Sequence, residues 1–481
     1  MLFNSFDFLL FFPVVTGLFF FLPHKFRWIL LLVASCYFYM YFRPVYILIL
    51  FSTIIIDYFA GIFIYKALTQ KIKKRFLVLS LVANIGILAV FKYFNFLNYN
   101  LSLIFDAVDQ HNPIPYLEIL LPIGLSFHTF QAMSYTIEVY RGNQKPEMHF
   151  GNYALYVMFY PQLVAGPIER PQNILHQFHE KKYFKYERVV SGLRLMLWGF
   201  FKKMVIADNL STVANNVFNN PNDQNSITFF IGALCFTFQI YCDFSGYSDI
   251  AIGSARVMGF ELMKNFNIPY AAKSIRDFWN RWHISLSTWF RDYLYIPLGG
   301  NRKGEFRKQI NVLIVFTVSG LWHGASWNFI IWGALNGCYL IILDLFQRTK
   351  LSEKNRNNII YRTTGALFTF FIVTLTWIFF RVTNVKEAWN AVYTILFGVK
   401  NTIAQGSISF SGLMLDNKKY FIALLFLTLI FFITDIFKDT AKVKEIYFKY
   451  PIIRYCSYFI LLFMIMTLSY VEETPFIYFQ F

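Results

Sequence analysis

Residues 315–334 read VFTVSGLWHGASWNFIIWGA and hold one ionisable side chain, His323, in the middle of a long apolar run. An ionisable side chain at membrane depth is unfavourable, so it faces protein interior or a cavity and is a candidate for function. Gly320 and Gly324 let a backbone or a ligand approach closely and weaken a continuous helix. From these residues alone, His323 is either a functional histidine or a core histidine packed between helices.

Composition places the chain in a membrane. Of its 481 residues, 57% are hydrophobic and 15% are charged, whereas soluble domains have about 45–50% apolar and about 25% charged residues. The net charge of +17 lies in short loops between apolar runs, a pattern that membrane topology explains without a nucleic-acid partner. The five cysteines show no CxxC pairing and are expected to be buried free thiols. We predict an all-α polytopic membrane protein with no metal site and no bound cofactor.

Apolar runs long enough to cross a bilayer, which takes about 20 residues, predict about eleven transmembrane helices. The expected spans are 6–22, 28–42, 45–65, 77–97, 119–140, 191–210, 227–252, 310–342, 362–381, 420–436 and 453–470. Shorter apolar pieces at 153–165 and 282–298 are expected to be re-entrant or interfacial. The first segment is expected to be retained, and no linker divides residues 1–481, which are predicted to form a single membrane domain.

Loop charges predict the orientation. The loop at 66–75 holds five Lys and Arg residues, whereas residues 98–118 hold acidic residues and no Lys or Arg. The first loop is therefore expected in the cytoplasm and the second outside, which by parity places the N-terminus and residues 471–481 outside. The same parity requires 310–342 to enter and return. Because this run is too short for two full spans, we expect a broken or re-entrant hairpin with His323 near its apex.

Two further stretches combine polar and apolar residues in an unusual way. Residues 276–300, RDFWNRWHISLSTWFRDYLYIPLGG, interleave aromatic residues with Arg, Asp and His. They are expected either to line an entry to the buried site at the cytoplasmic face or to anchor the protein at the interface. Asp243 and Asp249 lie inside an apolar segment and are expected to pair with arginine or histidine.

The sequence lacks the motifs of several familiar enzyme classes. The chain has no HxxxxD, GxSxG, Walker A, GxGxxG or HExxH motif. The nearest metal-like spacing, His176 and His179, lies among Gln, Phe, Glu and Lys and is expected on a solvated face.

Four motifs in order resemble the membrane-bound O-acyltransferase family, most of all its bacterial branch typified by the membrane subunit of alginate O-acetyltransferase. They are GPIER at 166–170, CDFSGYSD at 242–249, the stretch 278–300, and GLWHGA at 320–325. The resemblance covers nearly the whole chain and implies a multi-helix membrane fold around a central tunnel. It implies that His323 matches the essential histidine, and that His283 matches a second position occupied by His in this branch and by Asn in others.

The resemblance extends to the C-terminal residues 476–481, FIYFQF. They are similar to an aromatic motif in which the tyrosine, here Tyr478, relays the acyl group. The residues alone favour a different role, an aromatic anchor at the membrane interface.

The implied function is that of a membrane O-acyltransferase in the bacterial cytoplasmic (inner) membrane. It is expected to take an acyl group, acetyl foremost, from a cytoplasmic thioester such as acetyl-CoA. An extracytoplasmic SGNH-type partner would then pass the group to hydroxyls of a cell-envelope or exported polysaccharide. We expect neutral His323 to act as general base toward a hydroxyl such as that of Tyr478, with Asn328, Ser326 or the backbone of Gly324 donating to the oxyanion.

The remaining site residues are assigned by their types. The candidate donor and tunnel residues are Arg281, Trp282, Asp243, Trp322 and Asn328. The phosphates of the donor are expected to meet Arg281, Arg291, Arg302 and Lys303, unless these are ordinary cytoplasmic loop charges.

Two alternatives stay open. A transporter or flippase would line a glycan or lipid path with the same aromatic and charged groups and would need no covalent step. A D-alanyl transferase of the same family would use a carrier protein as donor.

Overall fold

The computed structural model describes residues 1–118, 122–164, 166–347, 358–404, 413, 418–470 and 474–479. Among these residues every regular element is a helix, which confirms the predicted all-α class. The chain divides into two compact units. One holds residues 1–196 and 248–264, and the other holds residues 197–247 and 265–480. The single membrane domain expected over 1–481 stays a prediction.

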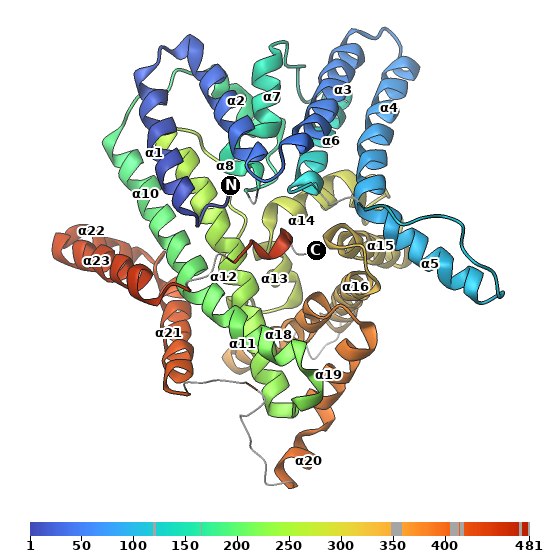
Figure 1. Ribbon diagram of the computed structural model, residues 1–481, viewed down its shortest axis with the longest axis vertical. Coiled ribbons are helices and arrows are strands. Elements are labelled where there is room, and N and C mark those ends of the chain that lie inside the picture. The colour runs from blue at the N-terminus through green and yellow to red at the C-terminus, as the bar shows by residue number, and fades with distance from the viewer. Residues whose placement is uncertain are drawn as a thin grey trace. The chain divides into compact units, whose positions relative to one another are not determined.

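The first unit is built from the N-terminal helices (Figure 1). They are α1 (Phe6–Phe21), α2 (His24–Met40), η1 (Pro44–Tyr46), α3 (Ile47–Lys66), α4 (Gln70–Leu88), η2 (Ala89–Tyr93), α5 (Phe94–Asp106), α6 (Leu125–Arg141), α7 (Phe150–Met158), α8 (Tyr160–Leu163) and α9 (Pro171–His179). Helix α10 (Tyr186–Phe200) begins in this unit, and α12 (Ser226–Met258) ends in it.

The second unit holds the remaining elements, which follow the same colour order in Figure 1. They are η3 (Phe201–Ala207), α11 (Asp208–Asn219), η4 (Pro221–Asp223), η5 (Pro269–Ala271), α13 (Ile275–Arg281), α14 (Ile284–Phe290), η6 (Arg291–Tyr295), α15 (Glu305–His323), α16 (Trp327–Gln347), α18 (Ile359–Arg381), α19 (Val385–Phe397), α20 (Val399–Ala404), α21 (Lys418–Phe437), α22 (Ala441–Lys449), α23 (Pro451–Leu468) and η8 (Ile477–Phe479).

Seven helical stretches in the described part of the chain are long and apolar enough to cross a membrane. They are Pro44–Lys66, Gln70–Asp106, Ser226–Met258, Trp327–Gln347, Ile359–Arg381, Lys419–Phe437 and Pro451–Leu468. The other expected spans also coincide with helices in the described residues; residues 119–121 of the expected span 119–140 lie outside them. These helices are shorter, as in α1, α2, α6 and α10, or more polar, as in α15. The chain is a multi-pass membrane protein, and large apolar side chains accordingly face outward, such as Ile452 (78% exposed) on α23.

The core of the first unit lies where α7 packs against α2, α3 and α6. Every residue of α7 from 151 to 158 is buried. The apolar piece expected at 153–165 falls on the two helices α7 and α8. With 9 and 4 residues, neither helix is long enough to span a membrane.

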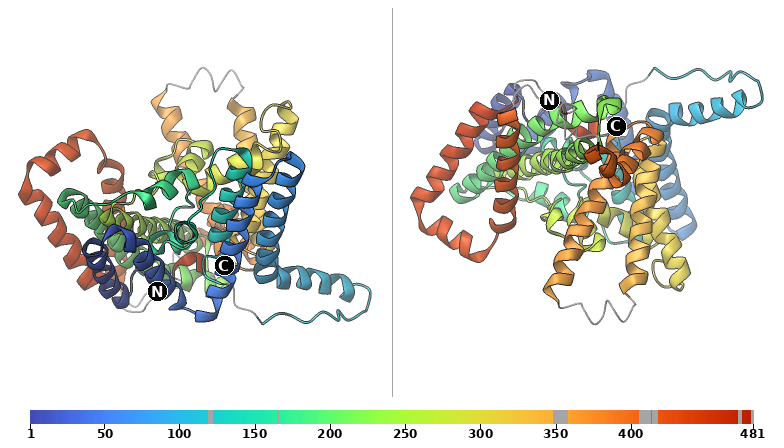
Figure 2. Two further views of the ribbon diagram at one scale, coloured as in Figure 1. Left: turned by 90° about the horizontal axis from the view of Figure 1, so that it is seen from above. Right: turned by 90° about the horizontal axis from the view of Figure 1, so that it is seen from below.

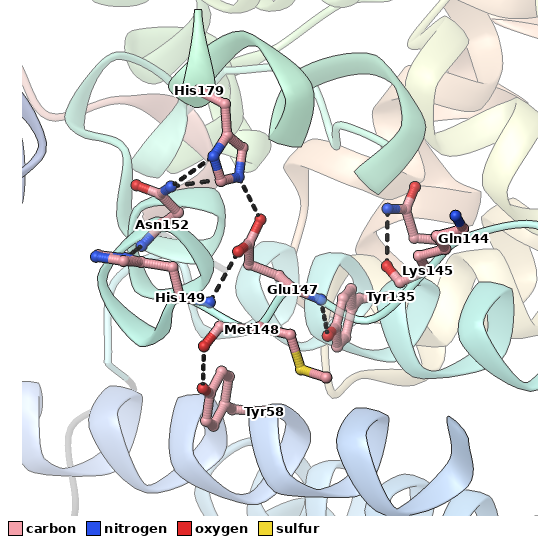
Figure 3. A network of polar contacts seen from close by, with 9 residues as sticks. All are labelled: Tyr58, Tyr135, Gln144, Lys145, Glu147, Met148, His149, Asn152 and His179. Carbon is pink, nitrogen blue, oxygen red and sulfur yellow. Dashed lines mark hydrogen bonds and ion pairs between the residues drawn. The ribbon is translucent and has the colours of Figure 1, made fainter. Parts of the chain in front are cut away.

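In the first unit, a network of polar contacts links the 142–149 segment to helices α3, α6 and α9 (Figure 3). The carboxylate of Glu147 lies 2.7 Å from His179 Nε2 and accepts the His149 N–H at 2.8 Å, while the Glu147 N–H donates to Tyr135 Oη at 2.9 Å. Tyr58 donates to the Met148 carbonyl at 2.7 Å. His179 is thus engaged with a carboxylate.

The second unit centres on the packed pair α15 and α16, which lie side by side in Figure 1 and in the views of Figure 2. Helix α18 packs against α16 and α19, and α13 packs against α14, α16 and α18. Three tryptophans fill the interior: Trp282, Trp332 and Trp377 are each 1% exposed. This packing fixes the elements that carry the site.

Candidate active site

His323 is the last residue of α15, at the apex of the hairpin that α15 forms with α16. The helix ends here because Gly324 is extended, with φ −163° and ψ 150°. The predicted break at His323 is confirmed. We expected the run 310–342 to be too short for two full spans, and this expectation about length is wrong. The two helices extend beyond 310–342 on both sides and contain 19 and 21 residues.

Glycines hold the two arms together. A Cβ atom on Gly320 would lie 2.1 Å from the Phe329 carbonyl oxygen, and one on Gly333 would lie 2.2 Å from the Phe316 carbonyl oxygen. No other residue fits at these distances. The sequence suggested that Gly320 allows either a backbone or a ligand to approach closely. The structure shows the approach of a backbone.

Four aromatic rings surround the imidazole of His323, which is only 4% exposed. The ring centroids of Trp322, Trp332, Phe380 and Tyr478 lie 4.9, 5.1, 5.3 and 5.5 Å from it. These residues come from α15, α16, α18 and η8, so four elements converge on one side chain. Such an environment excludes bulk water from the imidazole.

His283 lies between α13 and α14 in a left-handed conformation, with φ 42°. This conformation is uncommon for a residue with a side chain and is typical of functional sites. Asn265 holds the turn: its carbonyl accepts the Ile284 N–H at 2.9 Å, and its Oδ1 accepts the Ser285 hydroxyl at 2.6 Å. His283 is 1% exposed, and burial lowers its pKa to about 3, so its ring is neutral at pH 7.

One cavity reaches both histidines. It has a volume of about 600 Å³ and is lined by residues of α13, α14, η6, α15 and α16. The lining includes Lys308, near the start of α15, and His323, at its end. At 1.5 Å per residue these two positions are roughly 22 Å apart along the helix. The cavity is therefore an elongated slot.

The end of the slot near Lys308 is polar. Arg276 and Lys308 both pair with Asp344, at 2.9 and 2.8 Å, and all three line the cavity together with Arg291. Outside the lining, Asp292 pairs with Arg291 at 2.8 Å and Glu305 pairs with Lys308 at 3.4 Å, so three carboxylates pair with these three cations. The N–H groups of the three cations are the donors at this end of the cavity that an anionic group could meet.

The C-terminal residues 474–479 lie on the other side of His323. The ring of Phe476 packs 4.7 Å from Tyr247 and 5.4 Å from Phe244, both on α12. The Ile477 N–H donates to Asp243 Oδ2 at 2.8 Å. Figure 1 accordingly draws η8 beside α12, well away from α23. This contact brings Tyr478 to the histidines.

Tyr478 touches both histidines, with ring centroids 5.5 Å from His323 and 6.4 Å from His283. Its hydroxyl oxygen is buried. Burial and the nearby charge of Asp243 raise the pKa of Tyr478 above its ordinary value, so its hydroxyl stays protonated unless a base acts on it.

The other predicted site residues fall into two groups. Trp282 lines the cavity, and Trp322 packs against both histidines. Asn328 instead donates to the Val382 carbonyl and so joins α16 to the end of α18.

Charged residues of the prediction are also divided. Arg281 pairs with Asp277 at 2.7 Å and does not line the cavity. Of the expected phosphate ligands, Arg291 lines the cavity, whereas Arg302 and Lys303 do not. Asp243 pairs with a lysine, Lys203, and not with the arginine or histidine that we expected.

Sequence reasoning missed several residues of the site. Arg276 and Lys308 line the cavity, but their charges resemble those of any cytoplasmic loop. Trp332 and Phe380 contact His323 from helices that read only as apolar. Lys203 gave a usable signal, because it lies within an apolar run where a lysine is unfavourable.

The sequence is similar to those of known proteins. Residues 137–385 match the family described as MBOAT, membrane-bound O-acyltransferase family. The chain is 39% identical to a probable alginate O-acetylase of Pseudomonas aeruginosa, over 82% of this chain and 75% of the relative. It is 35% identical to a probable alginate O-acetylase of Pseudomonas putida over the full length of both. It is 36% identical to a peptidoglycan O-acetyltransferase of Helicobacter pylori, over 74% of this chain and 71% of the relative.

Family and enzyme class therefore agree with the expectation from the motifs, and they remove the basis for a transporter without covalent chemistry. The chain belongs to the membrane-bound O-acyltransferase family and is a membrane O-acyltransferase, and the relatives that share most of its length are O-acetyltransferases by name.

Proposed function

We propose that this enzyme moves an acetyl group from a cytoplasmic thioester, acetyl-CoA, to Tyr478, from which an extracytoplasmic SGNH-type partner transfers it to hydroxyls of a polysaccharide. The observation that carries the proposal is the position of His323. This residue lines the cavity, and its ring centroid lies 5.5 Å from that of Tyr478. One imidazole thus meets both a slot suited to a donor and a hydroxyl suited to an acceptor.

The cavity supports a CoA thioester as donor. Its end at Arg276, Arg291 and Lys308 offers cations for phosphate groups. Its length along α15 matches a linear arm that carries the thioester to His323. The walls at that depth are mostly apolar, as a pantetheine chain requires.

The chemistry is a single acyl transfer. The imidazole of His323 accepts the proton of the Tyr478 hydroxyl as its oxygen attacks the thioester carbonyl. A C–O bond forms and the C–S bond breaks, so Tyr478 becomes an aryl acetate and CoA leaves as thiolate. The thiolate takes the proton from the imidazolium, which restores neutral His323. A base is needed because burial raises the pKa of Tyr478.

An aryl acetate is a good donor for a second transfer. A phenol is a better leaving group than an alcohol, so a serine hydroxyl of the partner can accept the acetyl group and pass it to a sugar hydroxyl. Loop charges support an extracytoplasmic position for both termini, and the bacterial relatives support a location in the bacterial inner membrane. Relatives named for alginate and for peptidoglycan support a polysaccharide acceptor.

The test is direct transfer to the protein. Membranes holding the full chain are incubated with acetyl-labelled acetyl-CoA, and the C-terminal peptide is analysed by mass spectrometry. We expect an acetyl group on Tyr478 in the parent and none in Tyr478→Phe, while Tyr393→Phe, an exposed tyrosine on α19, behaves as the parent. Unchanged labelling of the protein in Tyr478→Phe contradicts the relay. Labelling by a D-alanyl carrier-protein thioester and not by acetyl-CoA favours the D-alanyl alternative.

A further inference from the structure

A buried group of three charges lies beside the C-terminal residues. Lys203 Nζ is 2.7 Å from Asp208 Oδ1 and 3.0 Å from Asp243 Oδ1, and the three side chains are 1%, 6% and 4% exposed. Buried charges are stable only when they are paired and hydrogen-bonded. One lysine thus holds two carboxylates in place.

The backbone is shaped to bring Lys203 to Asp243. Lys203 lies on η3, a π-helical turn between α10 and α11, and such turns are frequent at functional sites. Opposite it on α12, a Cβ on Gly246 would lie 2.8 Å from the Gly199 carbonyl oxygen and 3.2 Å from the Lys203 nitrogen. The close approach that Gly246 allows lets the lysine reach across to α12.

Lys203 and Asp243 each form a hydrogen bond with the C-terminal segment 474–479. Lys203 Nζ donates to Thr474 Oγ1 at 3.2 Å. Asp243 uses Oδ1 for Lys203 and Oδ2 for the Ile477 N–H, at 2.8 Å. The residue that follows Ile477 is Tyr478. Its hydroxyl is therefore placed by a chain of contacts that begins at Lys203.

The approach to this segment is fixed by the same elements. Asn209, at the start of α11, donates to the carbonyl of Leu468 at 2.8 Å, and the Tyr470 N–H donates to the Met204 carbonyl at 3.4 Å. These contacts position the chain upstream of Thr474. Residues 474–477 are held by the Lys203 group and by the packing of Phe476 against Tyr247 and Phe244.

We propose that Lys203 is a positioning residue for acyl transfer: with Asp208 and Asp243 it forms a clamp that holds residues 474–477 so that Tyr478 meets His323. This inference rests on the proposed role of Tyr478 as acyl acceptor. Lys203 touches neither the cavity nor the reacting atoms. Its loss should therefore slow acetylation of Tyr478 and leave binding of the donor unchanged.

The first measurement is hydrogen exchange of the Ile477 amide, read by mass spectrometry on the purified full chain. Lys203→Met removes the charge with little change in volume, and Thr474→Val removes only the hydroxyl that Lys203 binds. Thr474→Ser retains that hydroxyl. Lys438→Met is a matched control because it also removes a lysine from a buried aspartate, Asp435, which is 1% exposed and is also bound by Tyr241.

We expect the Ile477 amide to exchange about ten- to a hundredfold faster in Lys203→Met, as for loss of a charged hydrogen-bond partner, and less so in Thr474→Val. Thr474→Ser and Lys438→Met should match the parent. The second measurement is the single-turnover rate of Tyr478 acetylation, which should fall in the same two variants while the KM for acetyl-CoA stays unchanged. A loss of overall structure would instead raise KM or abolish donor binding.

The outcomes separate the two claims. Unchanged Ile477 exchange in both Lys203→Met and Thr474→Val overturns the clamp, and so does faster exchange with an unchanged acetylation rate. If Lys203→Met does not fold, the pair Thr474→Val and Thr474→Ser decides the matter alone. If the parent never carries acetyl on Tyr478, the proposed function fails and this inference fails with it; if it does, only the clamp is at stake.

Discussion

The ring of Tyr478 lies 5.5 Å from that of His323, and the same histidine lines the elongated cavity between α13–α14 and α15–α16. A single imidazole therefore separates a space suited to a thioester from the only tyrosine of the described C-terminal segment 474–479. This relationship orders the experiments that follow.

Replacement of the histidine tests its role as base. His323→Ala is expected to lower acetyl transfer by about 10²- to 10⁴-fold, the range for loss of a general base. Transfer is measured in membranes with matched protein levels. His111→Ala, an exposed histidine, serves as the control and should retain activity. Parent-like transfer by His323→Ala excludes its catalytic role.

The hairpin contact should be sensitive to one methyl group. Gly320→Ala places a Cβ 2.1 Å from the Phe329 carbonyl oxygen, which forces α15 and α16 apart. We expect a loss of about 1–3 kcal/mol in stability, seen as a lower thermal midpoint, together with reduced transfer. Gly86→Ala on α4 has open space around its Cβ and should be neutral or slightly stabilising. Equal midpoints for the two variants would contradict the close packing.

Charge at the mouth of the cavity should act on the donor's phosphates. Arg291 lines the cavity, with a side chain 60% exposed. Because exposed charges interact weakly, Arg291→Gln is expected to raise the KM for acetyl-CoA only several-fold, or about 1 kcal/mol.

A donor without phosphates provides the contrast. The KM for S-acetyl-N-acetylcysteamine should be the same in Arg291→Gln and the parent, and Arg302→Gln, outside the cavity lining, should affect neither donor. An equal rise for both donors would show that Arg291 shapes the slot and does not bind phosphate.

The buried His283 predicts a pH-dependent stability. Its pKa is lowered to about 3 in the folded protein by burial, whereas an unfolded histidine takes up a proton near pH 6.5. As pH falls from 7 to 5 only the unfolded state gains this proton, so stability decreases, by about 2 kcal/mol from this residue at pH 5. The loss continues down to the folded pKa.

His283→Asn removes this contribution and is a suitable variant to compare, because the Asn side chain is polar and smaller than His and does not titrate. The thermal midpoint in detergent, measured at pH 7 and pH 5, should fall less in His283→Asn than in the parent. The other histidines contribute equally to both proteins. Identical losses would show that His283 is not held neutral by burial.

Local residue patterns predicted much of the fold and part of the site. A histidine between glycines in an apolar run indicated a break, and α15 does end at His323 with Gly324 extended. The loop charges could not reveal which cations face the cavity, because Arg276 and Lys308 differ from Arg302 and Lys303 only in tertiary position. That distinction depends on how α13 and α15 lie against α16, which carries their shared partner Asp344.

The position of the C-terminal segment was beyond sequence reasoning for another reason. Lys203 and Thr474 are 271 positions apart, and their contact requires a π-helical turn and the glycine at 246. The residues of the segment FIYFQF, taken alone, favoured an anchor at the membrane interface. Only the family resemblance favoured the site, and the structure places Tyr478 there.

The aromatic rings around His323 have a consequence for bioenergetics. A membrane protein that hands a group from one aqueous compartment to the other must not conduct protons, or the cell would lose its transmembrane gradient. Trp322, Trp332, Phe380 and Tyr478 pack against the imidazole, which is 4% exposed, and place apolar rings around it. In the proposed reaction the acetyl group would cross this layer because its bond to sulfur is exchanged for a bond to the Tyr478 oxygen. Ions cannot form such bonds and would stay in the compartment from which they came.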